Sequence, residues 1–299
     1  MNERRQALER DPSQRWWWML VIAALILAVI YVLAVLTPTG QHLENAALAG
    51  RQQTTTEMSR EATQALGNIT LTSLAVAGIT IVGIGLVRRQ FALTVAAVGV
   101  ILGGQALTQL LKRFVLGRPD LSGALPGIRH NSFPSGHTTV AMTLMVAIFL
   151  IVPYRWRGVA MLIVLTWATS IGAYTITAGW HRFSDTLGAD MVTLLMGAIA
   201  SLYLAKTGRL RRATRRHPLR VVFVIVSAIL GTVSLGLGLL LAITASQQPL
   251  SDEVIQWDLY LAAEALASAS SVFTALWFWA TWRRIDVVPA VRKAGRHES

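Results

Sequence analysis

Eight apolar stretches dominate the pattern of hydrophobic and polar positions along the chain. They fall at about 16–36, 67–87, 91–111, 138–153, 159–179, 186–205, 221–244 and 259–282. A membrane-spanning helix needs roughly 20 apolar residues, and most of these stretches have that length. The stretch at 138–153 is short and can borrow residues from 133 onward. The pattern therefore predicts an all-α integral membrane protein with eight spans and short loops.

The composition agrees with this picture. Of 299 residues, 54% are hydrophobic and 14% are charged, with a mean hydropathy of +0.52. A soluble domain carries about 25% charged residues, so a soluble globule and a disordered chain are both excluded. The chain has no cysteine, which excludes disulfides, thiolate nucleophiles and cysteine-bound metals. Histidine and carboxylate side chains are left for chemistry.

The charge distribution predicts the orientation of the spans. In a soluble protein, a net charge of +12 would indicate a nucleic-acid partner. Here the basic residues are concentrated in the loops and tails between the spans, as in membrane proteins, and we expect no nucleic-acid partner. The basic tail 1–15, the basic loop 206–220 and the tail 283–299 all lie inside if the N-terminus is cytoplasmic, which predicts an N-in, C-in topology. The loop 206–220 either binds anionic lipid headgroups or serves as a topology anchor, and anchoring is the simpler reading.

The N-terminal stretch is predicted to be a signal anchor. Its 21 or so apolar residues are more than a cleavable signal peptide uses, and it begins with Trp16, Trp17 and Trp18, a residue type of the membrane interface. The polar segment after it, Thr37 to Leu66, is expected to form an interfacial helix. Some basic residues remain outside in this topology. They are Arg51, Arg60, Lys112, Arg113, Arg118, Arg129 and Arg182.

Three polar segments stand at the predicted outer ends of spans. The first runs from Lys112 to Pro119 and closes the third span. A residue before proline avoids the α region, so the helix should end before Arg118 and let that side chain turn back toward Lys112. Two cations facing one point suit an anionic ligand, although lysine and arginine at this depth also extend toward lipid headgroups.

The second segment is Ser132-Phe-Pro-Ser-Gly-His137, which opens the fourth span. Ser135 and Gly136 predict a capped helix start whose free N–H groups can bind a phosphate oxygen. Glycine lets a ligand approach the backbone closely. His137 lies in the first turn and can offer a proton to the same ligand.

The third segment, Trp180 to Asp185, lies between the fifth and sixth spans. His181 and Asp185 are four residues apart, which puts them on one face if this stretch is helical, so that the carboxylate can hold the imidazole N–H and fix its tautomer. The other ring nitrogen is then a better nucleophile or base. The alternating topology brings all three segments to the same outer face.

These three segments resemble the signature motifs of the type 2 phosphatidic acid phosphatase family, membrane-embedded lipid phosphatases that share a helical core with vanadium-dependent haloperoxidases. The resemblance covers about residues 67–205. It implies that His181 is a nucleophile that forms a phosphohistidine, that Asp185 orients it, and that His137 protonates the leaving alcohol. It also implies that Lys112, Arg118, Ser135 and the Gly136 amide hold the phosphate, and that no metal or other cofactor is required.

The sequence departs from this family at two places. The spacing between Lys112 and Arg118 is one residue shorter than usual, and Thr175 stands where the third motif normally has an arginine. One phosphate-binding cation is therefore missing. Arg182, Arg129 and Arg113 are the candidates to replace it, and we expect Arg182 because it adjoins the nucleophile.

The predicted organisation is a basic tail (1–15), a six-helix phosphatase core (16–205), a basic loop (206–220), an additional helix pair (221–282) and a second tail (283–299). We expect a cell-membrane enzyme that hydrolyses a lipid phosphate monoester or diphosphate at the extracytoplasmic side, such as phosphatidate, phosphatidylglycerol phosphate or a polyprenyl diphosphate. Its two histidines would start in opposite protonation states, which predicts a bell-shaped pH profile.

Two alternatives stay open. The missing arginine is compatible with a catalytically weak protein that binds or transports a lipid phosphate, and Asp190 and Glu264 inside predicted spans would suit a proton-linked pathway. The simpler reading of those two acids is hydrogen bonding between helices. The extra helix pair could also form a homo-oligomer surface, since its first helix contains Gly231, Gly236 and Gly238.

Overall fold

The structure is a computed structural model that describes residues 12–69, 71–122, 131–208, 210–213 and 218–287. Helices make up almost all of it. They are α1 (Ser13–Ile30), α2 (Pro38–Gly50), α3 (Thr56–Gly67), α4 (Leu71–Val87), α5 (Phe91–Leu110), α6 (Gly136–Ile151), α7 (Arg157–Thr177), α8 (Phe183–Lys206), α9 (Pro218–Ser246) and α10 (Glu253–Thr281). Two short strands, β1 (Leu210–Arg212) and β2 (Ile285–Val287), pair in antiparallel fashion.

The helices account for all eight predicted stretches. Six helices among the described residues are long and apolar enough to cross a membrane, and α4 and α6 are shorter apolar helices at the two remaining stretches. The chain is thus a helical multi-pass membrane protein, as its composition predicted. The number of spans and their N-in, C-in orientation stay predictions. The predicted tails 1–15 and 283–299 lie largely outside the described residues.

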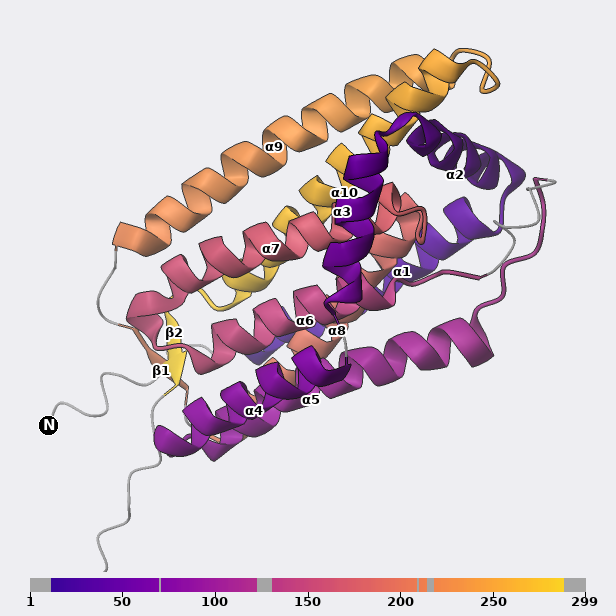
Figure 1. The fold of residues 1–299 in the computed structure, drawn as a ribbon. Helices are drawn as coiled ribbons and strands as arrows, with labels where there is room; N and C mark the ends of the chain where they lie inside the picture. Colours follow the sequence, from indigo (N-terminus) through magenta and orange to yellow (C-terminus); the bar gives the residue numbers. More distant parts are fainter. Residues whose placement is uncertain (1–11, 70, 123–130, 209, 214–217, 288–299) are drawn as a thin grey trace, which may run out of the picture.

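Helix α8 is the centre of the bundle. It packs against α1, α5, α6 and α10 (Figure 1). Of its most apolar stretch, 67% is buried, against 17% for α9, which packs on α10 and α7 and exposes its remaining sides. Gly188 of α8 allows the segment before α6 to approach α8 closely. A Cβ at this position would lie 2.6 Å from the ring of Phe133, so only glycine lets the segment before α6 lie against α8.

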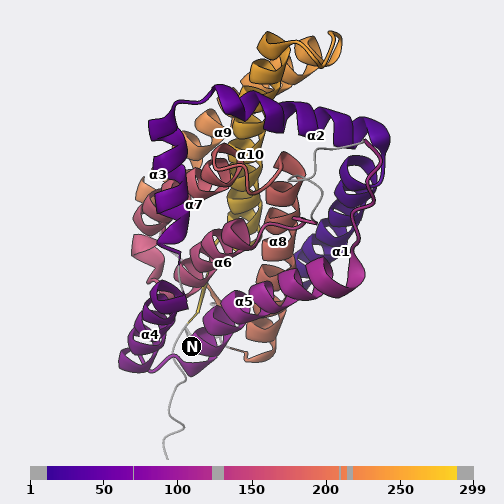
Figure 2. The same ribbon diagram turned by 45° about the vertical axis from the view of Figure 1, so that its right-hand side comes forward.

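The polar segment between the first two spans forms two helices where one was expected. Helix α2 begins with Pro38 after the N-cap Thr37, whose hydroxyl accepts a hydrogen bond from the Gly40 amide. Helix α3 follows after a short turn. Helix α2 packs against α10 and lies across one end of the bundle, whereas α3 packs against α7 and runs down its side (Figure 2). The end under α2 carries the three polar motifs.

Candidate functional site

The three motifs meet at the end of the bundle that α2 covers. Helix α5 ends in a π-helical turn, Leu111–Val115, which carries Lys112, and the backbone is extended at Leu116. The helix therefore ends before Arg118, as the following proline predicted. Ser135 is the N-cap of α6, and Arg182 is the N-cap of α8. Each motif thus lies at a helix terminus, where unpaired backbone groups collect.

His181 and Asp185 form the predicted pair. The His181 Nδ1 lies 3.2 Å from the Asp185 Oδ2, and the same oxygen accepts a 2.8 Å hydrogen bond from the Arg182 amide. The His181 amide donates to the Thr175 carbonyl at 3.1 Å, which fixes the turn before α8. Both side chains are buried. Donation from Nδ1 to the carboxylate leaves Nε2 as the nitrogen with a free lone pair.

His137 faces the same place from α6. Its ring centroid lies 6.4 Å from that of His181 and 5.3 Å from that of Trp180. Its side chain is half-buried. One imidazole therefore comes from α6 and the other from the turn before α8, and they stand far enough apart to leave a small group between them.

The start of α6 is capped by Ser135 and leaves space beside Gly136. The Ser135 hydroxyl accepts from the Thr138 amide at 3.3 Å, and the Ser135 amide donates to the Asp185 carbonyl at 2.8 Å. Among the residues that the structure describes, a Cβ at Gly136 would meet only the Gln109 side chain, at 3.9 Å. The N-terminal end of α6 therefore has room for an anion beside the glycine.

Arg118 has a partner that the sequence did not indicate. Its Nη2 lies 3.1 Å from the Glu44 Oε2, and the pair is almost entirely buried. The other carboxylate oxygen of Glu44 accepts a 2.9 Å hydrogen bond from the Ser184 amide at the start of α8. Burial raises the pKa of Glu44, as does the nearby Asp185 carboxylate, while Arg118 opposes the rise. An acid on α2 thus stands beside a predicted phosphate ligand.

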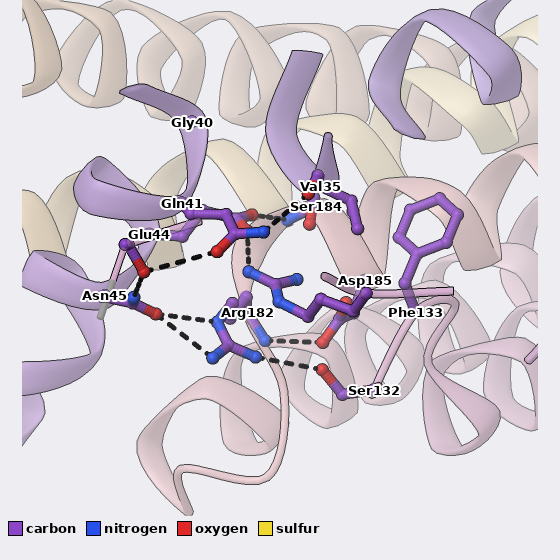
Figure 3. A network of polar contacts seen from close by, with 12 residues as sticks. Val35, Gly40, Gln41, Glu44, Asn45, Ser132, Phe133, Arg182, Ser184 and Asp185 are labelled. Carbon is purple, nitrogen blue, oxygen red and sulfur yellow. Dashed lines mark hydrogen bonds and ion pairs between the residues drawn. The ribbon is translucent and has the colours of Figure 1, made fainter. Parts of the chain in front are cut away.

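The Arg182 guanidinium donates hydrogen bonds to Asn45 and Ser132. Its Nε and Nη2 donate to the Asn45 Oδ1 at 3.2 and 3.1 Å, and its Nη1 donates to the Ser132 hydroxyl at 3.3 Å (Figure 3). Asn45 comes from α2 and Ser132 precedes α6. The guanidinium therefore joins three elements of the site and is buried among them.

Asn131 connects the first motif to the second. Its Nδ2 donates to the carbonyls of Lys112 and Leu116, at 3.0 and 2.6 Å, and its Oδ1 accepts from the Phe133 amide. Sequence reasoning missed Asn131, Glu44 and Asn45. Asn131 had a weak signal, because it directly precedes the second motif.

The remaining candidates have simple roles or cannot be placed. The Thr175 hydroxyl donates to the Gly172 carbonyl within its own helix. Arg113 is exposed, and Arg129 lies outside the described residues. Asp190 accepts hydrogen bonds from Ser270 and Ser271 of α10, and Glu264 accepts from Tyr260 and Thr177. Both acids therefore hydrogen-bond between helices, which fits the simpler reading. Within the described ranges, no group of three or more His, Asp or Glu side chains is suited to a metal ion.

The comparisons with known proteins agree with the motifs. Residues 92–209 match the family model of the PAP2 superfamily, whose members are phosphatases and related hydrolases. The match contains all three motifs and leaves out α1 to α4, α9 and α10. No curated protein and no solved structure matched the chain. The resemblance of the three motifs to this family is therefore confirmed over residues 92–209.

Proposed function

We propose that the protein is a membrane lipid phosphatase that works through a phosphohistidine. One observation carries the proposal: the Nδ1 of His181 is held by Asp185, and a second histidine, His137, faces His181 from α6. The Nε2 of His181 attacks phosphorus in line with the leaving oxygen. His137 donates a proton to that oxygen, and water then cleaves the phosphohistidine.

Charge on the phosphate oxygens is stabilised by groups that are in place before reaction. Lys112 and Arg118 supply positive charge, and the amide at Gly136 supplies a donor at a helix N-terminus. Ser135 shapes that terminus. The substrate is a lipid, because the site lies at the end of a bundle of membrane helices, within lateral reach of a headgroup. We place this end at the extracytoplasmic face on the distribution of basic residues.

The test is release of phosphate from purified protein given phosphatidate, phosphatidylglycerol phosphate, and polyprenyl mono- and diphosphates, each with and without a chelator. We expect release from at least one lipid that persists with the chelator and disappears in His181→Ala. A ³¹P signal of phosphohistidine, trapped at low temperature, should disappear in the same variant. Unchanged release by His181→Ala would refute the proposed nucleophile.

A second function is favoured by a specific pair of observations. Thr175 replaces the motif arginine, and Arg118 is already neutralised by Glu44. A protein that binds or transports a lipid phosphate without turning it over would tolerate both features. Tight binding of a lipid phosphate, with no release from any lipid in the panel, would select this alternative.

Arg182 is the proposed replacement for the missing motif arginine. We expect Arg182→Ala to lower turnover by at least about tenfold, since hydrogen bonds to charged groups contribute about 1.5–3 kcal/mol. Arg113→Ala is the matched control, because Arg113 is exposed. Near-normal turnover of Arg182→Ala would eliminate this role.

A further inference from the structure

A basic pocket lies at the end of the molecule away from the three motifs. It occupies about 300 Å³ where α9 begins and α10 ends. Figure 1 shows the start of α9 at the same end of the bundle as the β1–β2 pair. Three arginines and a tyrosine line one part of it, and aliphatic side chains of α9 line the rest. The lining residues are Tyr154, Arg220, Val221, Val224, Ile225, Arg283 and Arg284.

Arg220 is built into the wall of this pocket. Its guanidinium carbon lies 3.9 Å from the ring centroid of Tyr154 and 4.2 Å from that of Trp279. The residue is only 7% exposed, yet its buried Nη1 has no hydrogen-bond partner among the described residues. A buried donor without a partner is costly, whereas a guanidinium stacked on aromatic rings still offers its N–H edge to an anion.

The nearby acid does not neutralise the pocket. Asp286 of β2 pairs with the buried Arg157, whose Nη2 lies 3.3 Å from the Asp286 Oδ1. Arg157 also donates to the Ile285 carbonyl. Asp286 also interacts electrostatically with Arg220, so this one carboxylate is shared by two arginines. Among the described residues, the pocket therefore keeps a net positive charge for a ligand. Such a cluster favours an anion that several N–H groups can bind together, as a phosphate does.

The aliphatic wall selects an amphipathic ligand. Val221 and Ile225 are about half exposed on a helix that is mostly unburied in the bundle, so this wall is continuous with the surface that faces lipid chains. We propose that the pocket binds the headgroup of an anionic phospholipid, with its phosphodiester between the three arginines and its acyl chains along α9. Basic pockets between membrane helices are known sites for such headgroups.

This site is separate from the proposed reaction. Tyr154 and Thr177 stand at opposite ends of a helical segment of 24 residues, which separates the pocket from His181 by roughly 35 Å. A phosphodiester lipid such as phosphatidylglycerol is not a monoester or diphosphate, so its binding does not depend on the phosphatase proposal.

The test is a native mass spectrometry titration of the full chain with phosphatidylglycerol and phosphatidylcholine of equal chain length. We expect phosphatidylglycerol to bind on the order of tenfold more tightly. Arg283→Gln combined with Arg284→Gln should abolish the preference, because both side chains line the pocket. The control combines Arg155→Gln with Arg212→Gln, which removes the same charge from exposed positions at this end. This control variant should keep the preference for phosphatidylglycerol.

Arg220→Gln should also lose the preference, and the double variant of Arg283 and Arg284 serves if Arg220→Gln fails to fold. Glycerol 3-phosphate at millimolar concentration distinguishes a lipid from a free phosphate compound. Failure to displace phosphatidylglycerol supports the lipid, whereas full displacement overturns it. Equal binding of the two lipids, or equal loss in both double variants, also overturns the proposal.

Discussion

The Asp185 carboxylate determines how His181 is presented. It is buried, and one of its oxygens accepts both the His181 Nδ1 contact and the Arg182 amide hydrogen bond. Replacing this acceptor with an amide can reverse the tautomer of the imidazole without changing its position. Asp185 therefore acts on the proposed nucleophile through hydrogen bonding.

We expect Asp185→Asn to lower kcat for lipid phosphate release by about 10³-fold or more, by analogy with the effect of this change in a serine protease triad. Asp190→Asn is a matched control, since Asp190 is a buried carboxylate on the same helix with serine partners. The control should keep kcat within about threefold. Thermal unfolding of both variants checks the fold, and equal losses of kcat would contradict the orienting role.

Glu44 forms an ion pair with Arg118, a proposed phosphate ligand, and it gives the site a specific pH dependence. Its pKa is raised by burial and by Asp185, so it takes up a proton at a higher pH than an ordinary glutamate. Above that pKa the carboxylate neutralises Arg118 and repels phosphate. Below it, Glu44 is neutral and Arg118 keeps its full charge.

Glu44→Gln should therefore strengthen inhibition by inorganic phosphate about fivefold at pH 8, equivalent to about 1 kcal/mol. As the pH falls through the raised pKa of Glu44, the wild-type inhibition constant should approach that of the variant. Glu57→Gln, at an exposed position of α3, is the control. A ratio that stays constant from pH 5 to 9 would contradict this account.

At the scale of elements, the hydropathy pattern predicted the apolar helices because a membrane helix must be apolar over a known length. The three motifs were also predictable, since each combines charge, proline or glycine with a span terminus. The contribution of α2 was not. Glu44 meets Arg118 across 74 residues of sequence, and no local pattern in a polar helix specifies such a partner. Long-range pairing of this kind depends on how helices pack.

Helix α8 and the segment before α6 must approach closely for the site to form. Gly188 makes this possible, because a Cβ there would lie 2.6–3.1 Å from Phe133 and Pro134, and the Phe133 ring is fully buried. Gly188→Ala should lower the unfolding free energy by about 1–3 kcal/mol through overpacking. It should also lower activity, since Ser135 and Gly136 follow directly.

Gly78→Ala in α4 is the control for this change. No atom lies within 4 Å of a Cβ at Gly78, so the substitution should be neutral or slightly stabilising. Thermal unfolding in detergent and phosphate release measure the two effects. A Gly188→Ala protein with unchanged melting and activity would show that the α8 contact tolerates the extra methyl group.

At the scale of the whole molecule, the two ends of the bundle carry different chemistry. One end holds the histidine pair under α2, and the other holds the arginine pocket beside β1 and β2. The hairpin of α9 and α10 connects them. Helix α10 contacts α2 at one end, and its last turn carries Trp279, on which Arg220 stacks. The additional helix pair is thus packed into the core that the family model covers.

The difference between the two ends predicts how the protein is oriented in the membrane. Cysteine labelling can measure this orientation, because the chain has no cysteine of its own. Ser251 is exposed between α9 and α10 at the histidine end, and Arg155 is exposed at the arginine end. With most basic residues inside, Ser251→Cys should react with a membrane-impermeant maleimide in intact cells. Arg155→Cys should react only after the membrane is opened. The reverse pattern would place the histidine pair in the cytoplasm and would require a lipid phosphate of the inner leaflet as substrate.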